Sequence, residues 1–264
     1  MCEVVSNRQG CECCELPNRV NRSNPQCDNA QSPDLAAADR GDYRRHMDIA
    51  VLGTGNVGRT LTQALRDLDH TVVVGSRTGD NSAALEWTAA VGASLATFAD
   101  AAAASELIIN ATAGVASLAA LGSIAPDALA GKVIIDLANS LDFSQGFPPT
   151  LAVCNDDSLG EQIQREFPEA LVVKALNTMN CELMVSPASV PGDHVVFIAG
   201  NDDSAKVTTT ALLGEFGWAT DNVIDLGDIS AARGTEMYLP LWLRLMQSVG
   251  HANFNINLVV GPPS

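Results

Sequence analysis

The hydrophobic pattern becomes regular at residue 47, where short apolar runs start to alternate with amphipathic segments. Residues 49–52 and 72–74 are apolar runs of the length of one buried strand. Between them, apolar side chains recur at helical spacing, at Val57, Leu61, Ala64, Leu65 and Leu68. A strand, a helix and a second strand over this length predict a βαβ unit.

The same alternation continues to the end of the chain. Further strands are predicted over residues 93–98, 106–110, 132–136, 170–176, 194–200 and 220–226. Helices are predicted over residues 81–91, 99–104, 115–129, 158–167, 202–216 and 229–249, with a break at Pro126 in the third of these and a kink at Pro240 in the last. Residues 251–264 are expected to form a closing apolar strand and tail. This order predicts an α/β fold with a Rossmann-like, doubly wound, mostly parallel sheet and a smaller C-terminal α/β region.

The loop between the first strand and the first helix carries the candidate chemistry. It is a G-x-G-x-x-G sequence, made of Gly53, Thr54, Gly55, Asn56, Val57 and Gly58. The first glycine allows a tight turn, the second lets the backbone approach a pyrophosphate, and the third permits close packing of the helix. The helix N-terminus then offers unpaired N–H groups to the phosphates. Because a strand precedes the loop and a helix follows it, a dinucleotide site is favoured over another Gly-rich turn.

The end of the second strand indicates which dinucleotide binds. An NAD site usually carries Asp or Glu there, to hold the ribose 2′-hydroxyl. This chain has Gly75 followed by Ser76, Arg77 and Thr78. A guanidinium and two hydroxyls suit a 2′-phosphate, which a carboxylate would repel. The sequence therefore predicts NADP(H), with Asp80 close enough to leave NAD open.

Small polar residues follow three later strands. Thr112 follows the strand 106–110, Asn139 and Ser140 follow 132–136, and Asn177 and Thr178 follow 170–176. Ligands of open α/β sheets bind at the carboxyl ends of strands, although Thr112 fits an ordinary turn equally well. Thr112 and Asn139 are further candidate cofactor contacts, and Asn177, Thr178 and Asn139 are the catalytic candidates. This patch can orient a carboxamide or a flat ring, but it contains no strong acid or base.

The N-terminal segment differs from everything that follows. Residues 1–46 are rich in Asn, Arg, Gln, Cys and Pro and show no helical or strand period, which predicts a disordered tail. Five of the seven cysteines lie here, including the pair Cys11 and Cys14. A structural zinc site usually brings two such pairs, so no metal is predicted. Met47 stands directly before the first strand, and translation starting there would leave the tail outside the protein.

Composition narrows the class of partner. The formal net charge is −16, which argues against nucleic acid as a ligand. No apolar run is long enough for a membrane span, and no secretory signal precedes the first strand. We therefore expect a cytoplasmic protein with a small-molecule acceptor. Positive charge is scarce, with lysines only at Lys132, Lys174 and Lys206. The histidines His70, His194 and His251 fit surface or core positions.

Residues 47–260 resemble the NADP oxidoreductases that use the deazaflavin coenzyme F420. They are similar also to the reductase domain of the six-transmembrane metalloreductases and to bacterial dinucleotide-binding proteins. The resemblance rests on the sequences GTGNVG, VVVGSR, VVKALNTMN and VVFIAGND, and on FGW followed by IDLGDISAARGTEMYLPLW. It implies that Gly53, Thr54, Gly55, Val57 and Gly58 hold the pyrophosphate and that Ser76 and Arg77 take the 2′-phosphate. It further implies that Asn177 and Thr178 border the nicotinamide, and that Ala232, Arg233 and Glu236 shape the C-terminal element over the cleft.

The functional prediction is an enzyme that transfers hydride between NADP(H) and a deazaflavin or similar flat acceptor. Few basic residues are available for the anionic tail of a deazaflavin, namely Arg233, Arg244 and Lys174. Reduction of an imine, a flavin or ferric iron stays open, as does a non-catalytic module that senses NADP(H). Residues 47–176 are the predicted NADP-binding domain, and residues 177–264 the predicted substrate and dimerisation region. The apolar stripe of Leu239, Trp242, Leu243 and Met246 is predicted to be core or dimer interface rather than part of a cofactor site, and the apolar C-terminal helix and strand favour a homodimer. The loop 143–150, FSQGFPPT, is a candidate lid.

Overall fold

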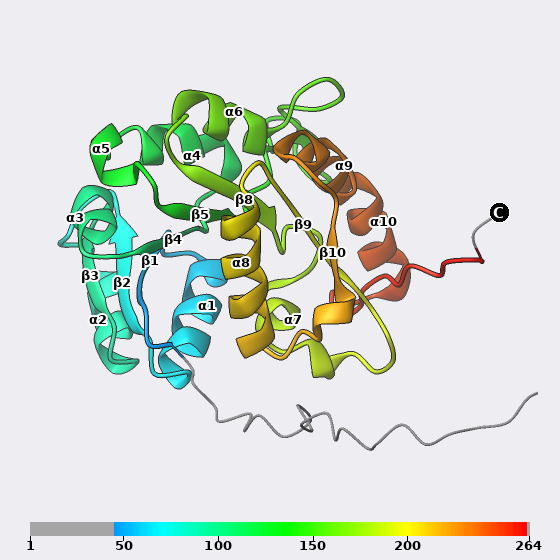
Figure 1. Ribbon diagram of the computed structural model, residues 1–264, viewed down its shortest axis with the longest axis horizontal. Coiled ribbons are helices and arrows are strands. Elements are labelled where there is room, and N and C mark those ends of the chain that lie inside the picture. The colour runs from blue at the N-terminus through cyan, green and yellow to red at the C-terminus, as the bar shows by residue number, and fades with distance from the viewer. Residues whose placement is uncertain (1–44, 263–264) are drawn as a thin grey trace, which may run out of the picture. The chain divides into compact units, whose positions relative to one another are not determined.

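An eight-stranded sheet organises the chain in a computed structural model that describes residues 45–262 (Figure 1). Its strands are β1 (Asp48–Leu52), β2 (Thr71–Ser76), β3 (Ser94–Thr97), β4 (Leu107–Asn110), β5 (Val133–Asp136), β8 (Leu171–Ala175), β9 (Val196–Gly200) and β10 (Val223–Asp225). The short strands β6 (Leu141–Asp142) and β7 (Thr150–Leu151) form a separate antiparallel hairpin. The α-helices are α1 (Asn56–Asp67), α2 (Ser82–Ala90), α3 (Phe98–Ala103), α4 (Gly114–Leu121), α5 (Pro126–Leu129), α6 (Leu159–Glu166), α7 (Cys181–Val185), α8 (Asp203–Glu215), α9 (Ala232–Met237) and α10 (Leu239–Val249).

The strand order confirms the predicted doubly wound fold. Across the sheet the order is β10-β9-β8-β5-β4-β1-β2-β3. From β3 to β8 all neighbours are parallel, β9 is antiparallel to β8, and β10 is parallel to β9. The chain winds outward in one direction from β1 and in the other from β4. The carboxyl ends of β1 and β4 are therefore the switch point at which ligands of such sheets bind.

Two apolar layers cover the sheet, because successive strand residues point to opposite faces. On β1, Ile49 and Val51 join the cluster packed by α1, α7 and α8, whereas Ala50 and Leu52 join the one packed by α3, α4 and α6. All four side chains are fully buried. Each buried Ile or Leu contributes about 1.5–3 kcal/mol relative to an exposed one, so the apolar runs themselves specify the three-layer arrangement.

Several helices begin where a capping side chain satisfies one of their first N–H groups. The side chain of Asn81 caps α2, Ser158 caps α6, and Asp202 caps α8. At α6 the cap is reciprocal, because the Ser158 hydroxyl also donates to the Glu161 carboxylate at 2.8 Å. These caps stand at or next to the predicted helix starts.

The C-terminal part departs from the predicted pattern. The closing strand over residues 251–264 is wrong for the described residues up to 262, which form no strand. A backbone hydrogen bond, 3.0 Å from the Val195 amide to the Ile256 carbonyl, ties this segment to the start of β9, and Val259 remains 89% exposed. The strand predicted over 220–226 is shortened, because its first residues form a 3₁₀ turn, η2 (Thr220–Asn222). The kink assigned to Pro240 is a break between α9 and α10, with Pro240 in the first turn of α10.

Several other expectations are settled or left open by the described residues. The described residues 45–262 belong to one compact unit, and the strands that follow residue 176 join the same sheet as β8. The functional division at residue 176 stays a prediction. The predictions for residues 1–44 and their cysteines lie outside the described residues, and a translation start at Met47 stays a prediction. Within residues 45–262, no helix has the length and apolar character needed to cross a bilayer.

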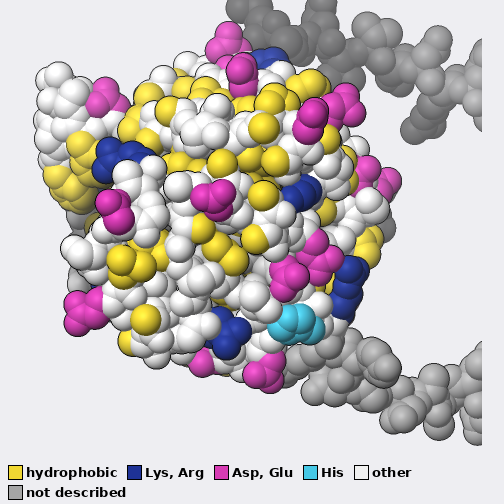
Figure 2. All heavy atoms as spheres, turned by 90° about the vertical axis from the view of Figure 1, so that its left-hand side faces the viewer, with side chains coloured by type: hydrophobic (Ala, Val, Ile, Leu, Met, Phe, Trp, Pro, Cys, Tyr) yellow, Lys and Arg dark blue, Asp and Glu magenta, His cyan; other side chains and the backbone are white. Residues whose placement is uncertain are grey.

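Figure 2, which faces the β3 edge of the sheet, shows acidic and basic side chains scattered among apolar ones.

Gly114 offers a test of how tightly the strand ends are packed. A Cβ atom at Gly114 would lie 2.1 Å from the Asn139 carbonyl oxygen, whereas a Cβ at the exposed Gly214 in α8 would meet nothing within 4 Å. We expect Gly114→Ala to lower the free energy of unfolding by about 1–3 kcal/mol through overpacking. The matched change Gly214→Ala should raise it by up to about 1 kcal/mol, because alanine favours the helix. Urea unfolding measures both, and a Gly114→Ala protein as stable as the original would contradict the packing.

Candidate active site

Two depressions flank the switch point at the carboxyl edge of the sheet. The first, which we call the polar hollow, has a volume of about 430 Å³ and is lined by Gly53, Thr54, Ser76, Arg77, Thr78, Asn81 and Phe98. The second, which we call the apolar pocket, has a volume of about 240 Å³. It is lined by Val57, Ala111, Thr112, Ala113, Gly114, Leu137, Ala138, Asn139, Leu141, Asn177, Met179, Met184, Leu239 and Trp242. The glycine-rich loop and the start of α1 stand between the two groups of lining residues.

Protein packing explains two of the three loop glycines. Gly53 has φ +124°, and a Cβ atom there would lie 2.5 Å from the Ala111 carbonyl oxygen. A Cβ atom at Gly58 would lie 2.1 Å from the carbonyl oxygen of Gly53. Both positions therefore exclude any side chain, whether or not a ligand is bound.

Gly55 is different, because nothing in the protein requires it to lack a side chain. Its φ is −76°, and a Cβ atom would meet no atom within 4 Å. It is the N-cap of α1 and provides no side-chain cap, so the first-turn N–H groups of the helix are left for another partner. An open space in front of unpaired amides suits a pyrophosphate, which is the group that the sequence predicts here.

The polar hollow contains the predicted 2′-phosphate residues. Ser76 is buried and its hydroxyl donates to the Thr78 carbonyl, which closes the turn after β2. Arg77 is exposed, and none of the ion pairs among residues 45–262 involves it. Its guanidinium is thus available to an anion in the hollow. Asp80, which had left NAD open, is exposed and is not among the lining residues.

Asn81 lines the polar hollow and was not among the sequence candidates. Its side-chain oxygen accepts from the Ala84 amide at 3.3 Å as the cap of α2. The amide nitrogen of the same side chain is a donor that the cap does not use. The predicted helix start at residue 81 was the available signal, because a cap placed five residues after β2 stands beside the ribose end of such a site.

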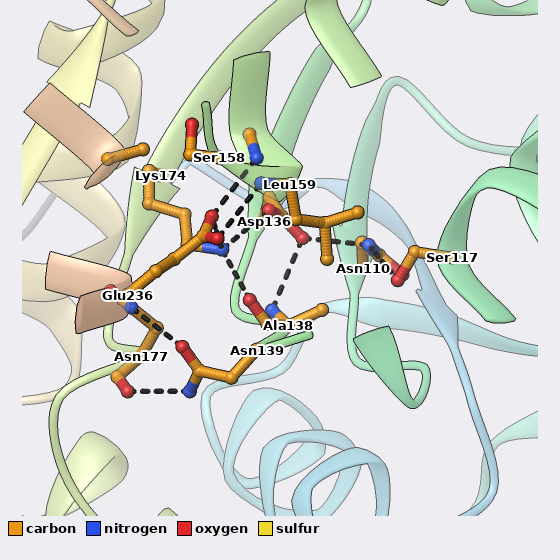
Figure 3. A network of polar contacts seen from close by, with 12 residues as sticks. Asn110, Ser117, Asp136, Ala138, Asn139, Ser158, Leu159, Lys174, Asn177 and Glu236 are labelled. Carbon is orange, nitrogen blue, oxygen red and sulfur yellow. Dashed lines mark hydrogen bonds and ion pairs between the residues drawn. The ribbon is translucent and has the colours of Figure 1, made fainter. Parts of the chain in front are cut away.

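The apolar pocket brings Asn139 and Asn177 together, as predicted. Asn139 donates its side-chain amide to the Asn177 carbonyl at 2.9 Å, and Asn177 donates back to the Asn139 side-chain oxygen at 3.0 Å (Figure 3). Thr112 also lines this pocket, with its hydroxyl held 2.7 Å from the Asn110 side-chain oxygen. Thr178 and Ser140 are buried and do not line it.

A buried ionic cluster behind the apolar pocket was missed at the sequence level. The Lys174 ammonium lies 2.8 Å from the Asp136 carboxylate and 2.9 Å from that of Glu236, and all three side chains are at most 1% exposed. Lys174 also donates to the Ala138 carbonyl. Burial disfavours the charged lysine, but the two carboxylates outweigh it and raise the pKa of Lys174. The sequence signal for this cluster was a lysine inside the apolar run LVVKA. A lysine can be buried in such a strand only if it is paired with an opposite charge.

This cluster corrects the candidates for binding an anionic acceptor tail. Lys174 cannot reach such a tail, because its ammonium is fully buried. Arg233 is engaged by Glu161, at 2.6 and 2.8 Å, and this contact holds the pKa of Glu161 below its usual value. Arg244 is the remaining candidate, and its guanidinium donates to Gln247 on the exposed side of α10. His70 and His194 are buried and His251 is exposed, as the sequence suggested.

Comparison with known proteins identifies the family. The family model described as NADP oxidoreductase coenzyme F420-dependent matches residues 48–140. A crystal structure from Arthrobacter sp. FB24, described as a candidate F420-dependent NADP-reductase, is 53% identical. It covers 81% of this chain and is itself covered completely, with a TM-score of 0.77. The chain belongs to the F420-dependent NADP oxidoreductase family. It is accordingly an NADP-dependent oxidoreductase.

More distant relatives share the fold or a part of the length. The metalloreductase STEAP3 of Rattus norvegicus is 29% identical over 199 residues, which are 74% of this chain. The chain spans 37% of the length of that relative. A reductive aminase of Aspergillus terreus, solved with NADPH and ethyl levulinate, is 19% identical with a TM-score of 0.57. The match covers 77% of this chain and 63% of the aminase chain. At that identity the likeness shows the fold alone.

The distinct status of Gly55 gives a direct test of the pyrophosphate site. We expect Gly55→Ala to leave the unfolding midpoint unchanged, because its Cβ has free space in the protein. Affinity for NADPH should fall about tenfold or more, because the methyl group enters the space that the pyrophosphate needs. Gly58→Ala is the contrasting variant and should lose stability through its clash with Gly53. Calorimetric titration with NADPH checks the prediction, and unchanged affinity in Gly55→Ala would refute it.

Proposed function

We propose that this oxidoreductase transfers a hydride from NADPH to a flat, conjugated ring acceptor of the deazaflavin type, coenzyme F420. The observation that carries the proposal is the chemistry of the apolar pocket wall. None of the residues that line this pocket has a titratable side chain. An acceptor reduced there receives its hydride without a positioned protein acid, and this requirement separates the classes of acceptor.

The proposed cofactor position follows from the two depressions. Adenosine with its 2′-phosphate would occupy the polar hollow, with Ser76, Arg77 and Thr78 as the proposed phosphate contacts. The pyrophosphate would lie over Gly53–Gly58, against the first N–H groups of α1. The nicotinamide would then enter the apolar pocket, where Thr112, Asn139 and Asn177 could orient its carboxamide by hydrogen bonds. This placement spans the switch point, as expected for a doubly wound sheet.

The proton balance favours a conjugated acceptor. When bound, NADPH supplies a hydride, so each turnover converts one acceptor, one NADPH and one proton into reduced acceptor and NADP⁺. An isolated imine or carbonyl gains a localised negative charge on its nitrogen or oxygen and needs an acid within hydrogen-bond reach that can give up a proton, which hydroxyl and amide side chains cannot do. A deazaflavin spreads the same charge over ring nitrogens and carbonyl oxygens, and solvent can protonate its outer edge. A wall without acids or bases suits the second class.

The rest of the wall suits a flat ring. Leu137, Leu141, Met179, Leu239 and Trp242 provide apolar surface on several sides. Trp242 is itself stacked on Phe254, with ring centroids 5.5 Å apart, which restricts how far it can turn. Holding two rings at about 3–3.5 Å is the main contribution that such a site makes to hydride transfer. The loop after Leu141, with Phe143 and Phe147 exposed, stays our candidate lid over this pocket.

Cofactor selectivity tests the role of Arg77. Replacing Arg77 by Ala should raise the KM for NADPH about 10- to 100-fold, because a charge-assisted hydrogen bond to the 2′-phosphate contributes about 1.5–3 kcal/mol. The KM for NADH should change little, since NADH lacks that phosphate. Arg165→Ala is the matched control, because Arg165 pairs with Asp157 and neither residue lines the polar hollow. Equal effects on both cofactors would remove Arg77 from the proposed site.

Acceptor choice tests the proposed reaction. Mixing enzyme and NADPH with the oxidised deazaflavin should bleach its visible absorbance within a stopped-flow trace. A cyclic imine of similar size should be reduced about 100-fold more slowly or not at all, because no positioned acid assists it. Turnover of the imine at the same rate would contradict the argument from the pocket wall. Tight NADPH binding without turnover of either acceptor would instead favour a sensing module.

We also propose a homodimer formed through the C-terminal helices. Met237, Leu241 and Val249 are exposed apolar residues on α9 and α10, at 38%, 55% and 49% exposure. Of the stripe predicted as core or dimer interface, Leu239 and Leu243 are buried within the chain, and Leu239 and Trp242 line the apolar pocket. The exposed apolar residues of these helices are therefore the remaining candidates for an interface, since exposed apolar patches are typical of interaction sites. Sedimentation velocity measures the assembly state directly.

A further inference from the structure

The buried Lys174 cluster makes no contact with the space that cofactor or acceptor would occupy. Lys174, Asp136 and Glu236 are all absent from the residues that line either depression. A buried ion pair is costly to desolvate, and replacing one by apolar residues often stabilises a protein. The cluster therefore invites an explanation other than stability, and its partners supply one.

The Lys174 ammonium uses its three hydrogens on three different segments. Strand register places Lys174 of β8 directly beside Asp136 of β5, and their side chains meet at 2.8 Å. The second partner is Glu236 of α9, and the third is the carbonyl of Ala138, just after β5 (Figure 3). An ammonium has three donors, so this one is fully satisfied in a single arrangement.

Each partner is held from its other side as well. The Asp136 carboxylate accepts from the Asn110 side chain at 2.7 Å and from the Ala138 amide at 3.2 Å. Glu236 accepts from the Leu159 and Gly160 amides, at 2.9 and 3.1 Å, at the start of α6. The N–H groups of that helix start compensate the second carboxylate, since one lysine faces two of them. The cluster thus joins β4, β5, β8, α6 and α9.

Three walls of the apolar pocket come from the segments that this cluster joins. Asn139 directly follows Ala138, whose amide donates to Asp136 and whose carbonyl accepts from Lys174. Asn177, its hydrogen-bond partner, is three residues after Lys174. Leu239 and Trp242 lie in the first turn of α10, which begins soon after Glu236 at the end of α9. A shift of the ammonium would therefore move all three walls.

We propose that Lys174 is a positioning residue, whose ammonium sets the relative position of the three walls that hold the nicotinamide against the acceptor ring. The inference rests on the proposed function for its kinetic consequence only. The fixed arrangement of the walls is a property of the protein itself. Lys174 neither touches the reacting groups nor transfers a proton to them.

The test removes one acceptor of the ammonium at a time. In Glu236→Gln an amide N–H₂ replaces one carboxylate oxygen and faces Lys174 or the α6 amides, so donor meets donor. Asp136→Asn makes the same change from β5 and serves if the first variant folds poorly. Ile163→Ala is the matched control, because it leaves a cavity under α6 without removing a charged contact.

Three measurements separate positioning from stability. Turnover of Glu236→Gln with saturating NADPH and deazaflavin should fall about 10- to 100-fold, as expected when reacting rings are misplaced. Affinity for adenosine 2′,5′-bisphosphate, which occupies only the polar hollow, should stay within about twofold. Hydrogen exchange without any ligand should show lost protection over residues 137–141 in Glu236→Gln and Asp136→Asn. Ile163→Ala should lower the unfolding midpoint while keeping turnover and the protection of this segment.

The outcomes distinguish this inference from the proposed function. Full turnover in a folded Glu236→Gln or Asp136→Asn protein overturns the positioning role. Equal loss of bisphosphate affinity and turnover overturns it too, because the effect would then be global. If the original protein does not turn over the deazaflavin, the proposed acceptor fails. The hydrogen-exchange data then test the positioning role of Lys174 by themselves. Unchanged protection of residues 137–141 in the variants refutes that role.

Discussion

A lysine ammonium buried between two carboxylates determines where the C-terminal helices meet the sheet. The three charged side chains come from three elements, Lys174 from β8, Asp136 from β5 and Glu236 from α9. Each provides a hydrogen-bond partner for the others or for a backbone amide, which apolar side chains cannot do. An unpaired charge at this depth would cost several kcal/mol, so arrangements of the three elements that separate these groups are disfavoured. The two asparagines of the apolar pocket stand at the edge of this arrangement. The polar interior thus specifies the shape of a pocket that is itself mostly apolar.

The glycine-rich loop shows how packing and ligand binding share one short sequence. Gly53 and Gly58 are required by backbone atoms that approach within 2.5 and 2.1 Å of a would-be Cβ. Gly55 has open space in front of it, and the proposed pyrophosphate position accounts for its lack of a side chain. A formal charge of −16 makes the overall field unfavourable for an anionic cofactor. In the proposed site, local donors have to overcome that field, namely the α1 amides and Arg77, which forms no ion pair within residues 45–262.

The two depressions divide the proposed chemistry between them. The polar hollow offers donors for recognition of a phosphate, whereas the apolar pocket offers surface and a pair of mutually bonded amides. A site of this kind accelerates a reaction by placing groups and excluding water rather than by transferring protons. The acceptor must then tolerate hydride addition without a positioned acid. That constraint connects the wall residues to a conjugated ring as the substrate class.

The sequence by itself determined the sheet, the place of the glycine-rich loop and the order of most helices. Apolar periodicity and glycine spacing are local signals, and they placed β1, α1 and β2 to within about two residues. The strand expected after residue 251 was wrong, because one backbone hydrogen bond to Val195 does not make a ladder. Only the tertiary structure decided that Lys174 is buried rather than available to an acceptor, and that Asn81 joins the polar hollow. Both depend on strand register and on contacts between residues far apart in the chain, which no local pattern encodes.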